Sequence, residues 1–303
     1  LDYETLKARY PKLVYAICTG YGEYGPDKDL PGFDFTAFFA RGGYLDSLRQ
    51  RGTVPMNVVP GLGDHNVGMN LAAGICAALL QAKLKGVGEK VETSLFESAI
   101  FNMGMMIQAS NYEGIAQNYP IDVRKSANPF NAAWRTKDDR FIQTCMPDFN
   151  TYYKAFITAV GREDLADSQE YFPILTCQEK GLTSELYDIV MDAFSKKTVA
   201  EWTLILEAAD IPFALAKNWM EIRNDKQAEA NNCFYDMTYS NGNTRRLVRL
   251  PVKFQEMGVP EYKTGPLIGE QGAEVLKELG YEDAQIKEMQ DKGALFVWKD
   301  ERK

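Results

Sequence analysis

The residues with the clearest chemical potential are Asp64 and its neighbours, in the stretch 60–70 that reads PGLGDHNVGMN. Gly61 and Gly63 permit a sharp turn and the close approach of a ligand. The apolar helical pattern that follows, over 66–84, places Asp64 at or just before a helix N-terminus. Free N–H groups and the helix dipole favour an ionised carboxylate there. Two interpretations follow: Asp64 is a covalent nucleophile toward an activated acyl group, with those amides stabilising the oxyanion, or it is an ordinary N-cap.

The rest of the composition removes most competing chemistry. His65 is the only histidine in the 303-residue chain, so a Ser-His-Asp triad or a multi-histidine metal site is not expected, and we predict no metal. The formal net charge of −8 argues against non-specific binding to nucleic acid. The five cysteines are widely spaced without a Cys-x-x-Cys pair, which favours buried free thiols in a reducing cytoplasm. We also expect no membrane span, because no apolar run approaches the roughly 20 residues needed.

The elements that must position Asp64 alternate between strand and helix. The apolar run 13–18 predicts a buried strand, and a Gly- and Pro-rich loop over 20–32 follows it. Asp34 then opens a helical stretch in which Phe35, Phe38 and Phe39 share a face. The helix over 66–84 is expected to bury one face that includes Leu71, Ile75, Ala78 and Leu79, and a strand over 90–95 and a helix over 96–108 come next. This order predicts an α/β layer with a parallel sheet.

The pattern of apolar and polar residues changes near residue 111. Residues 111–131 are polar, contain Pro120 and Pro129, and predict a linker. A hairpin is expected over 133–146, helices near 149–160, 183–196 and 198–208, and a second hairpin around Asn241-Gly242, a two-residue turn signal. Short helices over 270–279 and 284–290 close the chain. We therefore predict a large α/β domain over 1–110, the linker, a small α+β domain over 132–235, and a return to the large domain over 236–303.

The Asp64 segment and its helix closely resemble the aspartate-bearing segment of the class III CoA-transferases, the formyl-CoA and carnitine CoA-transferase family. Other stretches similar to the family follow in order along nearly the whole chain; they are TGYG at 19–22, PGFD at 31–34, GVGEKVETSLFE at 86–97, RTKDDR at 135–140 and GPLIGE at 265–270. Their order and spacing make the resemblance specific. It implies a Rossmann-like large domain with an inserted smaller domain, and interlocked homodimers. Family members also carry an N-terminal segment that completes the CoA site, and we expect this chain to begin after it.

The resemblance implies a role for each residue near Asp64. The Asp64 carboxylate would form an acyl anhydride with an acyl-CoA and then an aspartyl-CoA thioester, with coenzyme A as substrate, a small carboxylic acid as acceptor and no permanently bound cofactor. Asp34 matches an acidic position near the family's active site, where it could orient groups by hydrogen bonding or contact the substrate or CoA, and a helix N-cap is the alternative. His65, Asn66, Gly61, Gly63 and Phe33 are candidate substrate or CoA contacts, as is Asn128 in a region where relatives place a loop over the substrate. Arg41, Lys28 and Lys85 are candidates for the CoA phosphates, with a solvated surface role as the alternative.

Three functions remain open at this point. The first is CoA transfer. The second is α-methylacyl-CoA racemisation, which needs an acid/base pair; racemases of the superfamily have Gly-His-Asp where this chain has Gly32-Phe33-Asp34, and phenylalanine cannot exchange a proton. The third is a non-catalytic CoA-binding protein. The stretches 37–43 and 60–65 resemble the subgroup that acts on aryl or branched 2-hydroxy acids in amino-acid fermentation, the phenyllactate and 2-hydroxyisocaproate CoA-transferases.

Overall fold

The computed structural model describes residues 2–112, 114 and 119–296. The chain forms two compact units, Leu1–Ala216 and Lys217–Lys303. The elements of the first unit, from the N-terminus to the predicted linker, are α1 (Tyr3–Arg9), β1 (Tyr15–Thr19), η1 (Asp34–Ala40), α2 (Tyr44–Ser47), α3 (Leu62–Lys85), β2 (Lys90–Ser94), α4 (Leu95–Asn102), α5 (Gly104–Ala109) and η3 (Val123–Lys125). They are followed by β3 (Ala133–Arg135), β4 (Phe141–Thr144), α6 (Phe149–Ala159), η4 (Glu163–Leu165), α7 (Ile174–Glu179), α8 (Thr183–Phe194), α9 (Val199–Ala208) and β5 (Phe213–Leu215).

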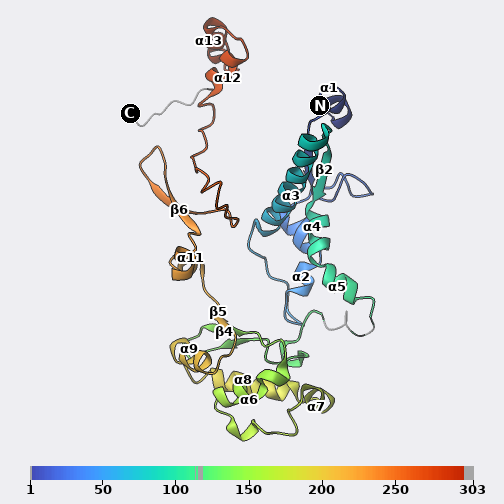
Figure 1. Ribbon diagram of the computed structural model, residues 1–303, viewed down its shortest axis with the longest axis vertical. Helices are drawn as coiled ribbons and strands as arrows, with labels where there is room; N and C mark the ends of the chain where they lie inside the picture. The colour runs from blue at the N-terminus through green and yellow to red at the C-terminus, as the bar shows by residue number, and fades with distance from the viewer. Residues whose placement is uncertain (1, 113, 115–118, 297–303) are drawn as a thin grey trace. The chain divides into compact units, whose positions relative to one another are not determined.

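The predicted strand–helix–strand unit is confirmed. β1 and β2 pair in parallel, from Tyr15 opposite Lys90 to Thr19 opposite Ser94, and α3 connects them. Figure 1 shows α3 running alongside β2, and the two are in contact. Gly74 permits this approach, because a Cβ there would lie 2.6 Å from Val91 Cγ1. The parallel pairing brings the carboxyl ends of both strands to one edge, where ligands bind in open α/β sheets.

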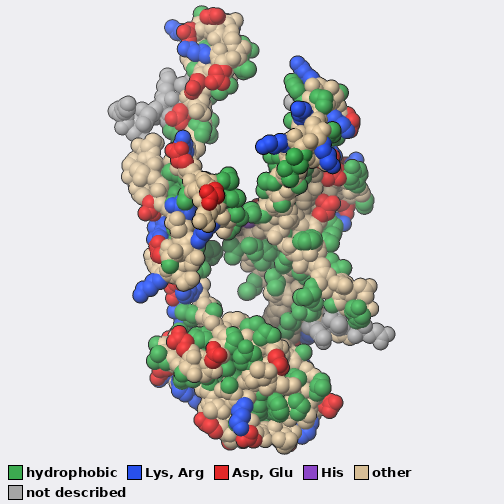
Figure 2. Space-filling view, viewed as in Figure 1, with side chains coloured by type: hydrophobic (Ala, Val, Ile, Leu, Met, Phe, Trp, Pro, Cys, Tyr) green, Lys and Arg blue, Asp and Glu red, His purple; other side chains and the backbone are tan. Residues whose placement is uncertain are grey.

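The predicted buried face of α3 is confirmed only in part. Ala78 is buried, Leu71 and Ile75 are half-buried, and Leu79 is 54% exposed. A sheet of two strands covers only a narrow strip of a helix, so the other apolar positions face outward. Figure 2 shows hydrophobic side chains gathered on the surface of this part of the chain.

α3 contradicts the expectation that no apolar segment approaches the length needed to span a membrane. Among the described helices it is the one that is long and apolar enough to cross a membrane by length and composition, with 24 residues and a mean hydropathy of 1.4. Core helices of proteins without membrane contact meet the same two conditions. α3 contacts β1, β2, α4 and η1, but only Gly63, Val67 and Ala78 along it are buried.

The junction between β2 and α4 is closed by Ser94, which is fully buried. Its hydroxyl accepts a hydrogen bond from the Glu97 N–H (3.0 Å) and donates one to Glu97 Oε2 (2.7 Å). The helix N-terminus thus has its side-chain cap. Replacing Ser94 with alanine should lower the free energy of unfolding by about 1 kcal/mol, measured by urea denaturation. Ser195→Ala, a change at an exposed C-cap on α8, is the control, and equal effects of the two changes would contradict this account.

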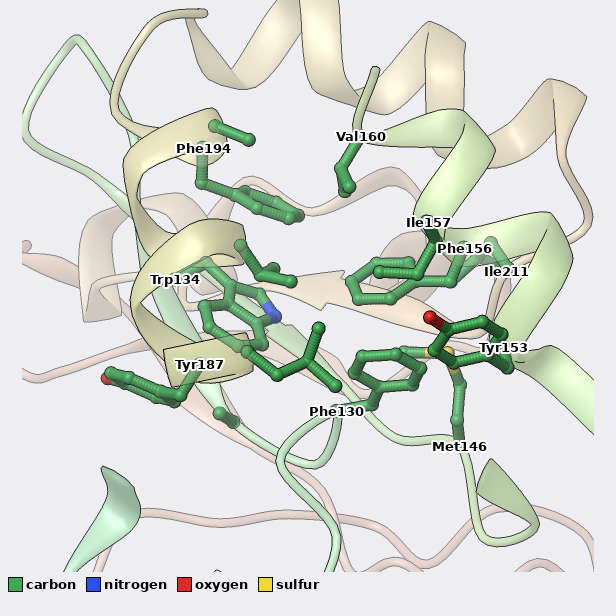
Figure 3. Packing of buried hydrophobic residues seen from close by; sticks show 14 of the residues in the cluster. Phe130, Trp134, Met146, Tyr153, Phe156, Ile157, Val160, Tyr187, Phe194 and Ile211 are labelled. Carbon is green, nitrogen blue, oxygen red and sulfur yellow. The ribbon is translucent and has the colours of Figure 1, made fainter. Parts of the chain in front are cut away.

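A second core lies between residues 130 and 211. The predicted hairpin is confirmed as β3 antiparallel to β4, and β5 adds a third strand that the sequence did not indicate. The predicted helices are confirmed as α6, α8 and α9. In this core, shown in Figure 3, Trp134, Phe156 and Phe194 are fully buried with ring centroids 5.5–6.4 Å apart. The core around η1 and α3 is separate from it. Most of the predicted linker over 111–131 therefore falls between two cores, but Phe130 near its end is buried in the second one. The domain bounds remain a prediction.

The second unit contains α10 (Trp219–Arg223), α11 (Lys226–Ala230), β6 (Phe234–Thr238), β7 (Thr244–Val248), α12 (Gly272–Glu278) and α13 (Asp283–Asp291). The hairpin predicted at Asn241-Gly242 is confirmed, but its turn is longer than two residues. Tyr239 N–H donates to the Asn243 carbonyl, the Gly242 N–H donates to the Tyr239 carbonyl, and Gly242 has φ of 79°. This is a three-residue loop with a glycine in the left-handed region.

Candidate active site

Asp64 lies in the first turn of α3, at the third helical position. The turn into the helix is made by Gly61, which has φ of 85° and ψ of −4° and provides no capping side chain. The Asp64 side chain is exposed, and the described residues give it no hydrogen-bond or ion-pair partner. The N-cap interpretation of Asp64 is therefore wrong. An exposed carboxylate at a helix N-terminus is available as a nucleophile.

Asp34 provides the cap that Gly61 lacks. Its side chain is only 7% exposed. Its Oδ2 accepts a hydrogen bond from the Gly61 N–H (2.6 Å), and its Oδ1 accepts one from the Gly63 N–H (2.9 Å). The alternative that Asp34 caps its own helix is wrong, because Asp34 is the first residue of η1 and its carboxylate is bound to α3.

The two glycines serve this contact in different ways. Gly61 adopts the left-handed conformation that glycine tolerates best. A Cβ on Gly63 would lie 2.3 Å from Asp34 Oδ1 and 2.4 Å from Phe38 Cγ, so the space beside Gly63 is filled by protein atoms rather than left for a ligand. The N–H groups of both glycines are also occupied by Asp34. They are not free to hold an oxyanion in this arrangement, which corrects that expectation.

The carboxyl end of β1 lies at the same place. Gly20 and Gly32 touch through their backbones, since a Cβ on Gly32 would lie 2.4 Å from Gly20 Cα. This contact closes the loop over 20–32 and brings Asp34 toward the end of β1. Desolvation and, next, the negative charge of Asp64 raise the pKa of the Cys18 thiol. Asp64, Asp34 and the end of β1 therefore form one local site at the carboxyl edge of the parallel strands.

Cys18 is a residue that the sequence analysis did not single out. Its place next to the last residue of a parallel strand, at the edge where ligands bind in such sheets, could have marked it as a candidate. Since the charge of Asp64 disfavours the thiolate, replacing Asp64 with asparagine should lower the Cys18 pKa and make its alkylation by iodoacetamide faster at a pH below that pKa. Peptide mass spectrometry measures the rate, with exposed Cys145 as the internal reference. An unchanged Cys18 rate, or an equal change at Cys145, would contradict the proximity.

The other predicted site residues divide into two groups. His65 is exposed, and its ring lies close to Gly61, whose Cβ position would be 3.9 Å from His65 Cε1. Phe33 is 67% exposed and precedes Asp34 directly. Both therefore lie beside the Asp34 contact, where a substrate could reach them, and their role as contacts stays a prediction.

Asn66 and Asn128 have internal partners. Asn66 Oδ1 accepts a hydrogen bond from Asn70 Nδ2 (3.4 Å), which also donates to Ser98 Oγ (3.0 Å), so the Asn66 amide is directed toward α4. Asn128 Nδ2 donates to the Met146 carbonyl (2.7 Å), and its Oδ1 accepts from the Phe130 N–H (3.0 Å). The structure thus gives Asn128 a place in the second core, apart from the local site around Asp64.

Arg41, a candidate for the CoA phosphates, is held by the protein. It forms an ion pair with Asp27 (2.6 Å), and its guanidinium lies 5.2 Å and 5.3 Å from the ring centroids of Tyr21 and Phe96. These contacts fix the loop over 20–32 against α4. Among the described residues, no group of three or more His, Cys, Asp and Glu side chains is arranged to hold a metal ion.

Comparisons with known proteins cover almost the whole chain. The profile of CoA-transferase family III matches residues 1–272. The cinnamoyl-CoA:phenyllactate CoA-transferase of Clostridium sporogenes is 51% identical over 99% of this chain and 73% of its own length. The (R)-2-hydroxy-4-methylpentanoate CoA-transferase of Clostridioides difficile is 38% identical over 96% of this chain and 72% of its own length. The α-methylacyl-CoA racemase of Mus musculus is more distant, at 24% over 94% of this chain and 72% of its own length.

Two solved structures share the fold. A CAIB/BAIF family protein from Brucella suis superimposes with a TM-score of 0.73 at 20% identity, over 92% of this chain and 71% of that one. Rv3272 from M. tuberculosis gives a TM-score of 0.69 at 23% identity, over 84% of this chain and 66% of that one. This chain spans about two thirds of the latter protein and about three quarters of its curated relatives. The mixed α/β fold predicted from the sequence is confirmed.

Proposed function

Since the chain belongs to CoA-transferase family III, we propose that it moves coenzyme A from an acyl-CoA thioester to a carboxylic acid, with Asp64 as the covalent nucleophile. The observation that supports this assignment is the state of Asp64. Its carboxylate is exposed in the first turn of α3, while Asp34 satisfies the glycine N–H groups of that turn. Because Asp64 does not cap the helix, its carboxylate oxygens are free for nucleophilic attack.

The reaction balances without water or a net proton. An Asp64 oxygen attacks the thioester carbonyl and the C–S bond breaks. CoA departs as the thiolate, and an acyl-aspartyl anhydride forms. The thiolate attacks the Asp64 carbonyl and releases the donor carboxylate, which gives an aspartyl-CoA thioester. The acceptor carboxylate then attacks that thioester and expels the thiolate again. Attack of the thiolate on the acceptor carbonyl forms the new acyl-CoA and restores the Asp64 carboxylate. Water must be kept out, because the anhydride hydrolyses readily.

For the acceptor we propose an aryl or branched 2-hydroxy acid. The named relatives at 51% and 38% identity act on phenyllactate and 2-hydroxy-4-methylpentanoate. Exposed Phe33 beside Asp34 is compatible with an apolar substrate side chain. A screen with cinnamoyl-CoA as the fixed donor would compare phenyllactate and 4-methyl-2-hydroxypentanoate with succinate and carnitine. Preference for succinate or carnitine would overturn the proposed acceptor class and leave the CoA transfer intact.

Trapping the intermediate tests the reaction itself. The complete protein is incubated with acyl-CoA and then with borohydride, which reduces an aspartyl thioester to an alcohol, and the peptide that contains residue 64 is weighed. We expect reduction at Asp64 only when acyl-CoA is present. Deuterium uptake at the α-carbon of the acyl-CoA in D2O, without a covalent adduct, would instead indicate racemisation. Binding of acyl-CoA with neither result would indicate a non-catalytic protein.

We also propose that the protein is a cytoplasmic homodimer with interlocked subunits, as family resemblance implies. The described cysteines are all free, which fits a reducing compartment, but the predicted burial is wrong for Cys18, Cys76 and Cys145, which are exposed. In the second unit, Leu250, Val252 and Phe254 lie on an extended segment and are 50–60% exposed, which is compatible with burial against a partner. Light scattering of the complete protein tests the dimer, and a monomeric mass at micromolar concentration would refute it.

A further inference from the structure

We propose that Asp34 is a positioning residue: its buried carboxylate occupies the N–H groups that would otherwise bind Asp64, and so keeps the nucleophile free. This inference rests on the proposed role of Asp64. It assigns Asp34 no contact with the substrate, in contrast to the substrate or CoA contact expected from the sequence.

The first turn of a helix has N–H groups without intrahelical partners. In a capping box, a Glu or Gln side chain at the third helical position reaches back to the N–H of the N-cap residue, and the shorter Asp side chain at that position faces the same N–H. Asp64 holds that third position and Gly61 is the N-cap. The Gly61 N–H, however, already donates to Asp34 Oδ2 at 2.6 Å. The Gly61 N–H is therefore not available to Asp64, and the described residues give the Asp64 side chain no other hydrogen-bond partner.

The Asp34 contact is built tightly enough to exclude alternatives. Asp34 is the one Asp or Glu among the described residues that is buried. Both of its oxygens accept from backbone N–H groups of α3, and hydrogen bonds to an ionised carboxylate are stronger than neutral ones. Gly63 leaves no room for a side chain between this carboxylate, Phe38 and the helix. The pair of carboxylates therefore divides the work, with Asp34 on the helix backbone and Asp64 facing outward.

The variant Asp34→Asn tests this division. An asparagine side chain has one acceptor oxygen and an NH2 group, so it cannot accept from both glycines. One N–H is released, and Asp64 can turn back to it. In the complete protein we expect the single-turnover rate of Asp64 adduct formation to fall at least about tenfold, with the KM for acyl-CoA within about threefold of wild type. Asp46→Asn, at the exposed position of α2, is the matched control and should leave both values unchanged.

The split between rate and KM distinguishes the possible roles. A KM raised more than about tenfold with the rate retained would show that Asp34 binds substrate, and values like wild type for both would show that it has no role; either result overturns the proposal. If Asp34→Asn does not fold, Gly63→Ala displaces both the same carboxylate and the Phe38 ring through a single methyl group, and the same fall in rate at unchanged KM is expected. Adduct formation by the wild type is measured in parallel, so that failure of the Asp64 assignment is recognised separately.

Discussion

The change Asp64→Ala should abolish CoA transfer in the complete protein, lowering the rate by about three orders of magnitude or more. Without the carboxylate neither the anhydride nor the aspartyl thioester can form, so the loss exceeds ~4 kcal/mol of transition-state stabilisation. The measurement is the formation of new acyl-CoA, followed by chromatography at saturating donor and acceptor. Asp192→Ala, on the exposed face of α8, is the matched control and should retain full activity.

Stability separates this role from helix capping. Since Asp34 already caps α3, loss of the Asp64 side chain should change the free energy of unfolding by no more than about 0.5 kcal/mol. Removing an aspartate that served as N-cap would cost about 1 kcal/mol and spare the activity. An active and destabilised Asp64→Ala protein would therefore reject the assignment of the nucleophile.

The change Trp134→Ala should have the largest effect on stability, with a loss of about 3–5 kcal/mol. Trp134 is fully buried on β3, its ring stacks on Phe194 at 5.5 Å, and its Nε1–H donates to Thr144 Oγ1 at 2.7 Å. The substitution leaves a cavity among aromatic rings and removes a donor from a buried hydroxyl. Urea denaturation followed by far-UV circular dichroism measures the change.

Trp219→Ala is the control for this prediction. Trp219 lies at the start of α10 and is 72% exposed, so its loss should cost less than about 0.5 kcal/mol. If Trp134→Ala destabilised the protein by less than about 1 kcal/mol, the core between residues 130 and 211 would not be packed as described.

The sequence predicts most elements of this fold, because the elements are coded locally. Alternating apolar residues and turn signals place β3, β4 and the β6–β7 hairpin, and helical spacing places α6, α8 and α9. β5 is missed because its three residues carry too little pattern to stand out from a loop. The prediction of a two-residue turn at Asn241-Gly242 is wrong for a related reason, because a type I turn with a left-handed glycine accommodates the same dipeptide. In the structure, Tyr239 and Asn243 close this longer loop.

The site is predicted less completely, because its key contact is not local. The glycine pattern and the apolar helix identify Asp64 as a candidate, but capping and catalysis have the same local signature. The hydrogen bonds that separate them join Asp34 to residues 27 and 29 positions away. The prediction of a buried face along α3 is confirmed only in part for the same kind of reason. Helical spacing shows that a face is apolar and does not show how many strands cover it.

The bond between Asp34 and Gly61 also decouples the reactive carboxylate from the chain between them. Both ends of the segment 35–60 are fixed by the same carboxylate. Phe38 of η1 packs on the start of α3, but the path of the segment beyond η1 and α2 has no direct effect on that turn. Residues 51–53 are held by hydrogen bonds, such as that from the Arg51 N–H to the Ile121 carbonyl (2.8 Å), whereas residues 54–57 are exposed. Because the entropy of closing a loop rises only slowly with its length, insertions there should be nearly neutral. The geometry of the reactive turn can thus persist while the neighbouring surface diverges, which leaves that surface free to acquire new specificity.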